Sequence, residues 1–318
     1  MNKADGTTTR LPSARDSALF EARVVVEACP PSREDQDRAY AVLRQSFSCY
    51  NSFHAVSVPD LQDTAEFHRA KDRVPNEEFA SYVRSLTDKP LSLYKVSSGC
   101  PRGEFEDWLA RAGELGCRDV FLVGADSSRA LSPDALTLGD SARLAARSGF
   151  RCGGIIIPTR RKQFVPRPAS VDEADRLVEK VRGHGFSFFS TQILYEGEWM
   201  CCLLLDLVRT MDGAEIPKVF LTFSPFVCAE DLIFAKRTLG VYVPGDVDRM
   251  LKGARSMREA SIGFLIQVWD RISSFANEIG FPADKLGVNV EYLDSRNPRN
   301  VDAAFELAEE FGRLFRRR

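Results

Sequence analysis

Ala22-Arg-Val-Val-Val-Glu27 is a short apolar run that ends in a carboxylate, and Ala28-Cys29-Pro30-Pro31 follows it at once. A proline pair cannot continue a central strand, because proline lacks the N–H that the hydrogen-bond ladder needs. The run therefore predicts a buried strand that stops beside Glu27. The carboxyl group is then held at the end of that strand and is not simply solvated.

Seven further apolar runs follow the first. Several are apolar almost throughout, as in Val120-Phe-Leu-Val123 and Ile155-Ile-Ile157, which is typical of parallel strands covered on both faces. The predicted strands are Arg23–Cys29, His54–Pro59, Leu91–Ser97, Asp119–Asp126, Gly153–Pro158, Phe186–Tyr195, Lys218–Ser224 and Leu286–Leu293.

Segments of helical periodicity lie between these runs, and Gly116, Gly149 and Gly185 each follow one of them, where a left-handed helix end is expected. We expect helices at Asp35–Phe47, Gly103–Leu115, Pro133–Ser148, Val171–Gly183, Glu198–Met211 and Ala229–Leu239. The long stretch Val241–Ser273 predicts a short helix joined through Arg249–Arg258 to a longer one, Glu259–Ile279, and Val301–Arg318 predicts the last helix.

This repeated alternation of strand and helix predicts an α/β fold, a closed (β/α)₈ TIM barrel in a single domain. A doubly wound open sheet is the alternative. No Gly-x-Gly-x-x-Gly follows any strand, which argues against the dinucleotide-binding form of that sheet.

Composition narrows the classes of function. The chain has 318 residues, 44% hydrophobic and 28% charged, with a net charge of -2, so it gives no electrostatic reason to expect nucleic acid. No apolar run is long enough to span a membrane. We interpret residues 1–18 as a disordered leader and 19–318 as the barrel, and we expect a cytoplasmic protein. The sequence is compatible with a homo-oligomer.

The eight cysteines and three histidines do not have the spacing of metal ligands. None of the cysteines forms Cys-x-x-Cys, so we expect no metal site. Most of the thiols lie beside apolar residues, as is typical of reduced, buried cysteines.

Reacting groups in such barrels lie where the strands end. Glu27 and Asp126 would both project into the mouth of the barrel, and partial burial there raises the pKa of a carboxyl group until it can donate a proton near neutral pH. Gln192 would place an amide in an apolar strand. Each has an ordinary alternative: Glu27 as an ion-pair partner, Asp126 as a turn or cap residue, and Gln192 as a core hydrogen bond.

Several motifs together resemble the methylenetetrahydrofolate reductase family over most of the chain. They are Val-Val-Glu27-Ala-Cys-Pro-Pro, Leu122-Val-Gly-Ala-Asp126, the helix that starts at Leu177, Ser190-Thr-Gln192-Ile-Leu-Tyr-Glu196 and Leu239-Gly-Val-Tyr-Val-Pro244. The resemblance rests on their order and spacing, because no single motif is diagnostic.

The resemblance implies reduction of 5,10-methylenetetrahydrofolate to 5-methyltetrahydrofolate. Glu27 would be the catalytic acid that opens the five-membered ring, and Asp126 would stabilise the developing positive charge. Gln192 would bind the pterin edge, and Phe226 or Phe234 would stack on the folate. NADH or NADPH would supply the hydride, in the family through FAD.

The departures from the family fall at the flavin-contacting positions. The run after the fifth strand is Ile157-Pro158-Thr159-Arg160-Arg161, and the third strand carries Leu93-Tyr94-Lys95-Val96. Lys180 matches the family pattern. Either Tyr94, Thr159, Arg161 and Lys180 form an altered FAD pocket, or the enzyme is flavin-free and NADH reduces the iminium ion directly. These residues favour the second interpretation.

Two other functions are compatible with the sequence. One is a folate-binding subunit that is not a reductase and hands a one-carbon unit to a partner protein. The other is a barrel of this type that reduces an unrelated carbonyl or amine.

Overall fold

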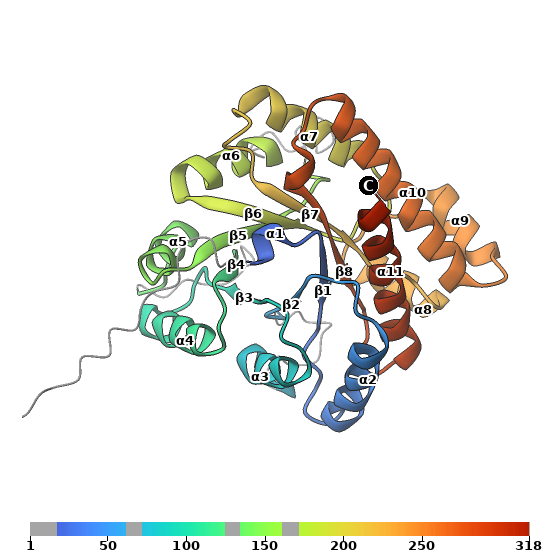
Figure 1. Cartoon of the computed structure of the whole chain (residues 1–318), viewed down its shortest axis with the longest axis horizontal. Helices are drawn as coiled ribbons and strands as arrows, with labels where there is room; N and C mark the ends of the chain where they lie inside the picture. The colour runs from blue at the N-terminus through green and yellow to red at the C-terminus, as the bar shows by residue number, and fades with distance from the viewer. Residues whose placement is uncertain (1–17, 62–71, 125–133, 161–171, 318) are drawn as a thin grey trace, which may run out of the picture.

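The computed structural model describes residues 18–61, 72–124, 134–160 and 172–317. Eight parallel strands form a closed barrel in chain order, with β8 paired to β1 (Figure 1). The strands are β1 (Val24–Glu27), β2 (Ala55–Val58), β3 (Leu91–Val96), β4 (Asp119–Val123), β5 (Arg151–Ile156), β6 (Phe186–Thr191), β7 (Lys218–Phe223) and β8 (Leu286–Glu291). The predicted single (β/α)₈ barrel is therefore confirmed, and the open sheet is excluded.

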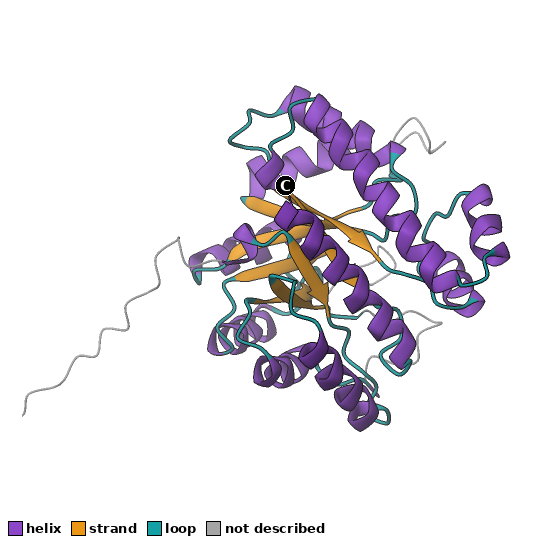
Figure 2. Ribbon diagram, turned by 45° about the vertical axis from the view of Figure 1, so that its right-hand side comes forward, coloured by secondary structure: helices purple, strands orange, loops and turns teal. Residues whose placement is uncertain are grey.

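Helices surround the strands (Figure 2). They are α1 (Ala18–Glu21), α2 (Gln36–Cys49), α3 (Asn76–Leu86), α4 (Arg102–Glu114), α5 (Leu138–Arg147), α6 (Glu173–His184), α7 (Glu198–Thr210), α8 (Ala229–Arg237), α9 (Gly245–Gly253), α10 (Met257–Glu278) and α11 (Pro298–Arg317), with a 3-10 turn at Ala283–Lys285. No helix in these ranges is both long enough and apolar enough to cross a membrane. Of the predicted leader, only Ala18 lies inside the described residues.

Most element boundaries differ from the prediction by a few residues. The helix predicted from Pro133 begins at Leu138, because Thr137 and Asp140 form a capping box that fixes the first turn. The predicted Arg249–Arg258 junction is shorter: α9 runs to Gly253, and Ser256 caps α10. Gly116, Gly149 and Gly185 have φ of 77°, 83° and 72°, the left-handed conformation that was predicted.

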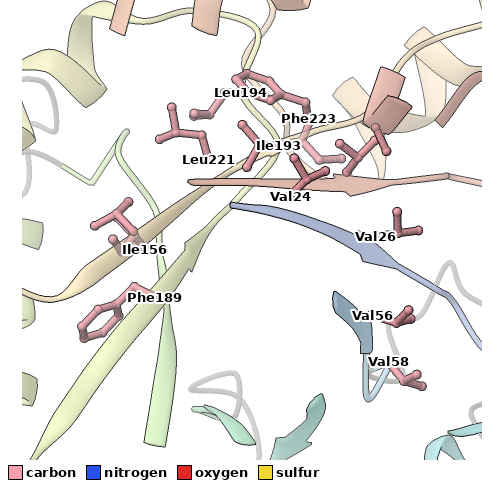
Figure 3. Packing of buried hydrophobic residues seen from close by; sticks show 14 of the residues in the cluster. Val24, Val26, Val56, Val58, Ile156, Phe189, Ile193, Leu194, Leu221 and Phe223 are labelled. Carbon is pink, nitrogen blue, oxygen red and sulfur yellow. The ribbon is translucent and has the colours of Figure 1, made fainter. Parts of the chain in front are cut away.

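The strands are buried on both faces. Val24, Val26, Val56 and Val58 pack in the cluster between the barrel and the helices (Figure 3). Val25 and Ala55, which alternate with them along β1 and β2, belong to a second cluster inside the barrel together with Leu19 and Ala22. Leu19 in α1 and Ala22 just after it thus help to fill the barrel interior.

Two aromatic rings inside the barrel occupy positions that a side chain at the adjacent glycine would block. A Cβ at Gly153 on β5 would lie 2.0 Å from the ring of Phe188, and one at Gly287 on β8 would lie 2.9 Å from the ring of Phe220. Both rings belong to the interior cluster. A side chain at either glycine would force its neighbouring ring to move.

Candidate active site

Polar side chains follow the apolar ones along the inner face of the barrel. Two residues after Val25, Ala55, Phe188 and Phe220 come Glu27, Ser57, Ser190 and Thr222, one on each of four strands. Because side chains on a strand alternate between its two faces, these residues face the same interior as the apolar cluster. The interior is therefore apolar in one layer and polar in the next, toward the carboxyl ends of the strands.

Glu27 is the centre of a hydrogen-bonded network in this polar layer. Its Oε2 accepts a hydrogen bond from the Tyr94 hydroxyl at 3.0 Å and one from Asn289 Nδ2 at 2.8 Å. Nδ2 of Asn289 also lies 3.4 Å from Thr222 Oγ1, and the Ser57 hydroxyl donates to Asn289 Oδ1 at 3.5 Å. Glu27, at 8% exposure, is thus buried with two donors aimed at one of its carboxylate oxygens.

A second carboxyl group lies beside Glu27. Glu291 is its register partner on the adjacent strand β8, so the two carboxyl groups are neighbours across the strand pair. Burial raises the pKa of Glu27, while the bonds from Asn289 and Tyr94 oppose that shift. Burial and then the negative charge of Glu27 raise the pKa of Glu291 well above its ordinary value. Such a pair retains a proton at a pH where an exposed glutamate has lost it.

The two carboxyl groups lie in the wall of a cavity of about 990 Å³. Its lining includes Glu27, Cys29, Glu291 and Tyr292 at the ends of β1 and β8, together with Phe234, Leu239 and Arg73. This volume suits a ligand the size of a cofactor or drug. Burial and the charges of Glu27 and Glu291 raise the pKa of the Cys29 thiol well above its usual range, so this cysteine is a poor nucleophile.

Phe234, a predicted folate-stacking residue, lies in this lining. Gln192, the predicted pterin-binding amide, is not itself a lining residue. Its Nε2 donates to the backbone carbonyl of Leu239 at 2.7 Å, and Leu239 lines the cavity. Gln192 therefore holds a segment of the cavity wall in place.

Phe226 and Tyr94 have surroundings different from those that the sequence suggested. Phe226 has 0% exposure and stacks on Tyr195 with ring centroids 4.3 Å apart, so it has no exposed face for a folate. Tyr94 stacks on Phe121 at 4.2 Å and donates its hydroxyl to Glu27. Phe226 is a core residue, and Tyr94 is part of the hydrogen-bonded network of Glu27.

Two of the other predicted cofactor residues, Lys180 and Thr159, are not among the residues that line the cavity. Lys180 donates to the carbonyl of Ile155 at 3.2 Å, and burial lowers its pKa. Thr159 is half-buried in the loop after β5 and is not among the cavity-lining residues. Asp126 and Arg161 lie outside the described residues. Among the residues that are described, no group of three or more His, Cys, Asp or Glu could hold a metal ion.

Asn289 was not predicted as a site residue, and Glu291 was expected at a strand end but was given no role in the chemistry. Glu291 was recognisable as the polar end of the eighth apolar run, and Asn289-Val-Glu291 has the two-residue spacing that places both polar side chains on one face. What the sequence did not contain was the register that sets Glu291 beside Glu27.

No family model matches this chain, and no curated protein matches it in sequence. Its fold is similar to that of an uncharacterized protein from Clostridium thermocellum that binds two copies of 5-methyl-5,6,7,8-tetrahydrofolic acid, with a TM-score of 0.73, 19% identity and coverage of 92% of this chain and 96% of that one. A protein from Aquifex aeolicus VF5 has a TM-score of 0.50 at 11% identity, covering 92% of this chain and 93% of that one. At these identities the likeness is one of fold.

Proposed function

We propose that this protein binds a reduced folate in the cavity above Glu27 and Glu291, and that it reduces 5,10-methylenetetrahydrofolate to 5-methyltetrahydrofolate. The observation that carries the proposal is the pair of neighbouring carboxyl groups at the wall of a cavity of about 990 Å³. The sequence motifs around Glu27 and Gln192 support it, as does the folate bound by the similar protein from Clostridium thermocellum.

The carboxyl pair supplies the proton that the reaction needs. Protonation of N10 allows the bond between N10 and the bridging carbon to break, and the electron pair of that bond stays on N10. The bridging carbon is then part of an iminium ion with N5. Hydride from NADH or NADPH adds to this carbon, which gives the methyl group and the oxidised nicotinamide. A buried carboxyl group with a raised pKa is suited to the first step.

Two of the residues expected at flavin-contacting positions, Tyr94 and Lys180, have partners within the protein. Tyr94 is 5% exposed and is hydrogen-bonded to Glu27, and Lys180 is bonded to a backbone carbonyl. We propose that the nicotinamide itself is the hydride donor, without FAD as an intermediate carrier.

The test is anaerobic incubation of the purified protein with 5,10-methylenetetrahydrofolate and either NADH or NADPH, with FAD added or omitted. Nicotinamide oxidation and 5-methyltetrahydrofolate formation are followed together. We expect equal amounts of the two products without added FAD. Replacing both carboxyl groups, Glu27→Gln with Glu291→Gln, should lower kcat about 100-fold or more.

Glu198→Gln is the matched control, because Glu198 is an exposed residue on α7 whose partner is Arg271. It should leave turnover unchanged. Binding of 5-methyltetrahydrofolate without any turnover would favour the folate-binding subunit that is not a reductase. A protein that neither binds folate nor oxidises the nicotinamide would refute the proposal altogether.

A further inference from the structure

The two carboxyl groups of the pair have unequal surroundings. Glu27 accepts hydrogen bonds from the Tyr94 hydroxyl and the Asn289 amide, both to Oε2. Donors to a carboxylate oxygen favour its charged form. The same amide is oriented by its second contact, to Thr222 at 3.4 Å. Because of these donors, a negative charge is more stable on Glu27 than on Glu291.

Glu291 has no comparable set of donors. Among the residues that the structure describes, no group donates a hydrogen bond to its carboxyl group, and its neighbour across the β1–β8 pair is Glu27. Two neighbouring carboxyl groups do not both ionise readily, because the negative charge of one disfavours the charged form of the other. Glu291 is half-buried in the cavity wall, whereas Glu27 is 8% exposed. The proton therefore lies on the group that is more open to the cavity.

We infer that Glu291 is the catalytic residue that donates the proton to the folate, and that Glu27 is the anion that holds Glu291 in its protonated form. This inference rests on the proposed function. In the step, the O–H bond of Glu291 breaks, the N10–H bond forms, and the electron pair of the breaking carbon–nitrogen bond stays on N10. Glu291 regains its proton from solvent after the methyl product leaves.

The two charges also serve the step that follows. Once Glu291 has donated its proton, both carboxylates are negative and lie at the wall of the cavity in which the cationic iminium ion forms. Fixed negative charge of this kind stabilises a developing cation without reorganisation of the site. The repulsion between the carboxylates is relieved when the cation is formed beside them, so proton transfer and ring opening are coupled.

Other titratable and charged groups face the pair, and none replaces Glu291 as the donor. Tyr94, Cys29 and Tyr292 have pKa values raised well above their usual range, first of all by burial, so they hold their protons too tightly for this role. Arg73 and Asp231 lie in the wall of the same cavity. The positive charge of Arg73 lowers the pKa of the Cys29 thiol and so opposes part of the effect of burial.

The kinetic test is the pH profile of kcat for the single variants Glu291→Gln and Glu27→Gln. We expect Glu291→Gln to lose about 100-fold or more at every pH, because the donor is gone. Glu27→Gln should retain turnover at acid pH, with its alkaline limb moved to lower pH, because Glu291 loses the negative neighbour that raises its pKa. The reverse pattern would assign the proton to Glu27 and overturn the inference.

A second measurement does not depend on turnover and so separates this inference from the proposed function. Infrared spectra at neutral pH should show a protonated carboxyl band in the wild-type protein that Glu291→Gln abolishes. In Glu27→Gln the band should persist at acid pH and disappear at a lower pH than in wild type. A band that survives in Glu291→Gln and is missing in Glu27→Gln at every pH would contradict the assignment, whatever the folate assay shows.

Discussion

At the scale of single residues, the site depends on the donors that favour charge on Glu27. Tyr94 is the more easily tested of the two. Its ring stacks on Phe121 at 4.2 Å and its hydroxyl lies 3.0 Å from Glu27 Oε2. Replacement by phenylalanine keeps the ring and removes only the hydrogen bond.

Tyr94→Phe should therefore destabilise the protein in a pH-dependent way. The folded-state pKa of Glu27 is raised, so its ionisation costs stability as the pH rises, and the Tyr94 bond offsets part of that cost. We expect a loss of about 1.5–3 kcal/mol in the free energy of unfolding at pH 8 and a smaller loss at pH 5, because the hydroxyl bonds an ionised carboxylate more strongly than a protonated one. Urea unfolding at the two pH values measures both.

Tyr82→Phe is the matched control. The Tyr82 hydroxyl donates to the uncharged backbone carbonyl of Tyr40 at 2.7 Å. Its loss should cost about 0.5–1.5 kcal/mol to a similar extent at both pH values. A Tyr94→Phe loss that is equally independent of pH would show that the hydroxyl does not bond an ionised Glu27.

The same residues show how much of the site the sequence contained. Glu27 was predicted at a strand end because two prolines follow shortly after it, and this signal can be found in the local sequence. Asn289 was not predicted and Glu291 was given no role, since the importance of both comes from lying next to Glu27 across β1 and β8. Gln192 was expected to face the ligand but binds the carbonyl of Leu239. Which neighbour satisfies a side chain is a tertiary property, and no spacing along the chain encodes it.

At the scale of elements, the sequence predicted which segments are strands and which are helices, because each type has its own periodicity. The residues at which the elements end were predicted less accurately. The β6 run was expected to reach Tyr195, but the strand ends at Thr191. Tyr195 instead packs on Phe226 and shares a hydrogen bond with Ser261 of α10. An apolar run does not reveal where its residues leave the sheet and enter the packing between helices.

The fit of β5 against β6 can be tested at Gly153. Gly153→Ala places a methyl group where the Phe188 ring lies, at 2.0 Å, so the ring or the strand must shift. We expect a loss of about 1–3 kcal/mol in the free energy of unfolding, measured by denaturant titration. Gly263→Ala in α10, where a Cβ meets nothing within 4 Å, should instead stabilise by about 0.5–1 kcal/mol. Equal stability of Gly153→Ala and wild type would mean that the interior is not filled as described.

At the scale of the whole molecule, barrel closure creates the site. β1 near the start of the chain pairs with β8 near its end, and this pairing alone brings Glu27 beside Glu291. The helix α8 contributes Phe234 to the lining of the same cavity. The central claim is that a reduced folate binds in this cavity, against the carboxyl pair.

The most direct measurement of that claim is the binding of 5-methyltetrahydrofolate to the wild-type protein, Phe234→Ala and Ile233→Ala by titration calorimetry. Ile233 is the neighbouring residue on α8 and is 45% exposed, so it controls for a general effect on the helix. We predict that wild type and Ile233→Ala bind with the same Kd, and that Phe234→Ala binds about tenfold more weakly. Absence of binding to the wild type, or equal binding by all three proteins, would contradict the account.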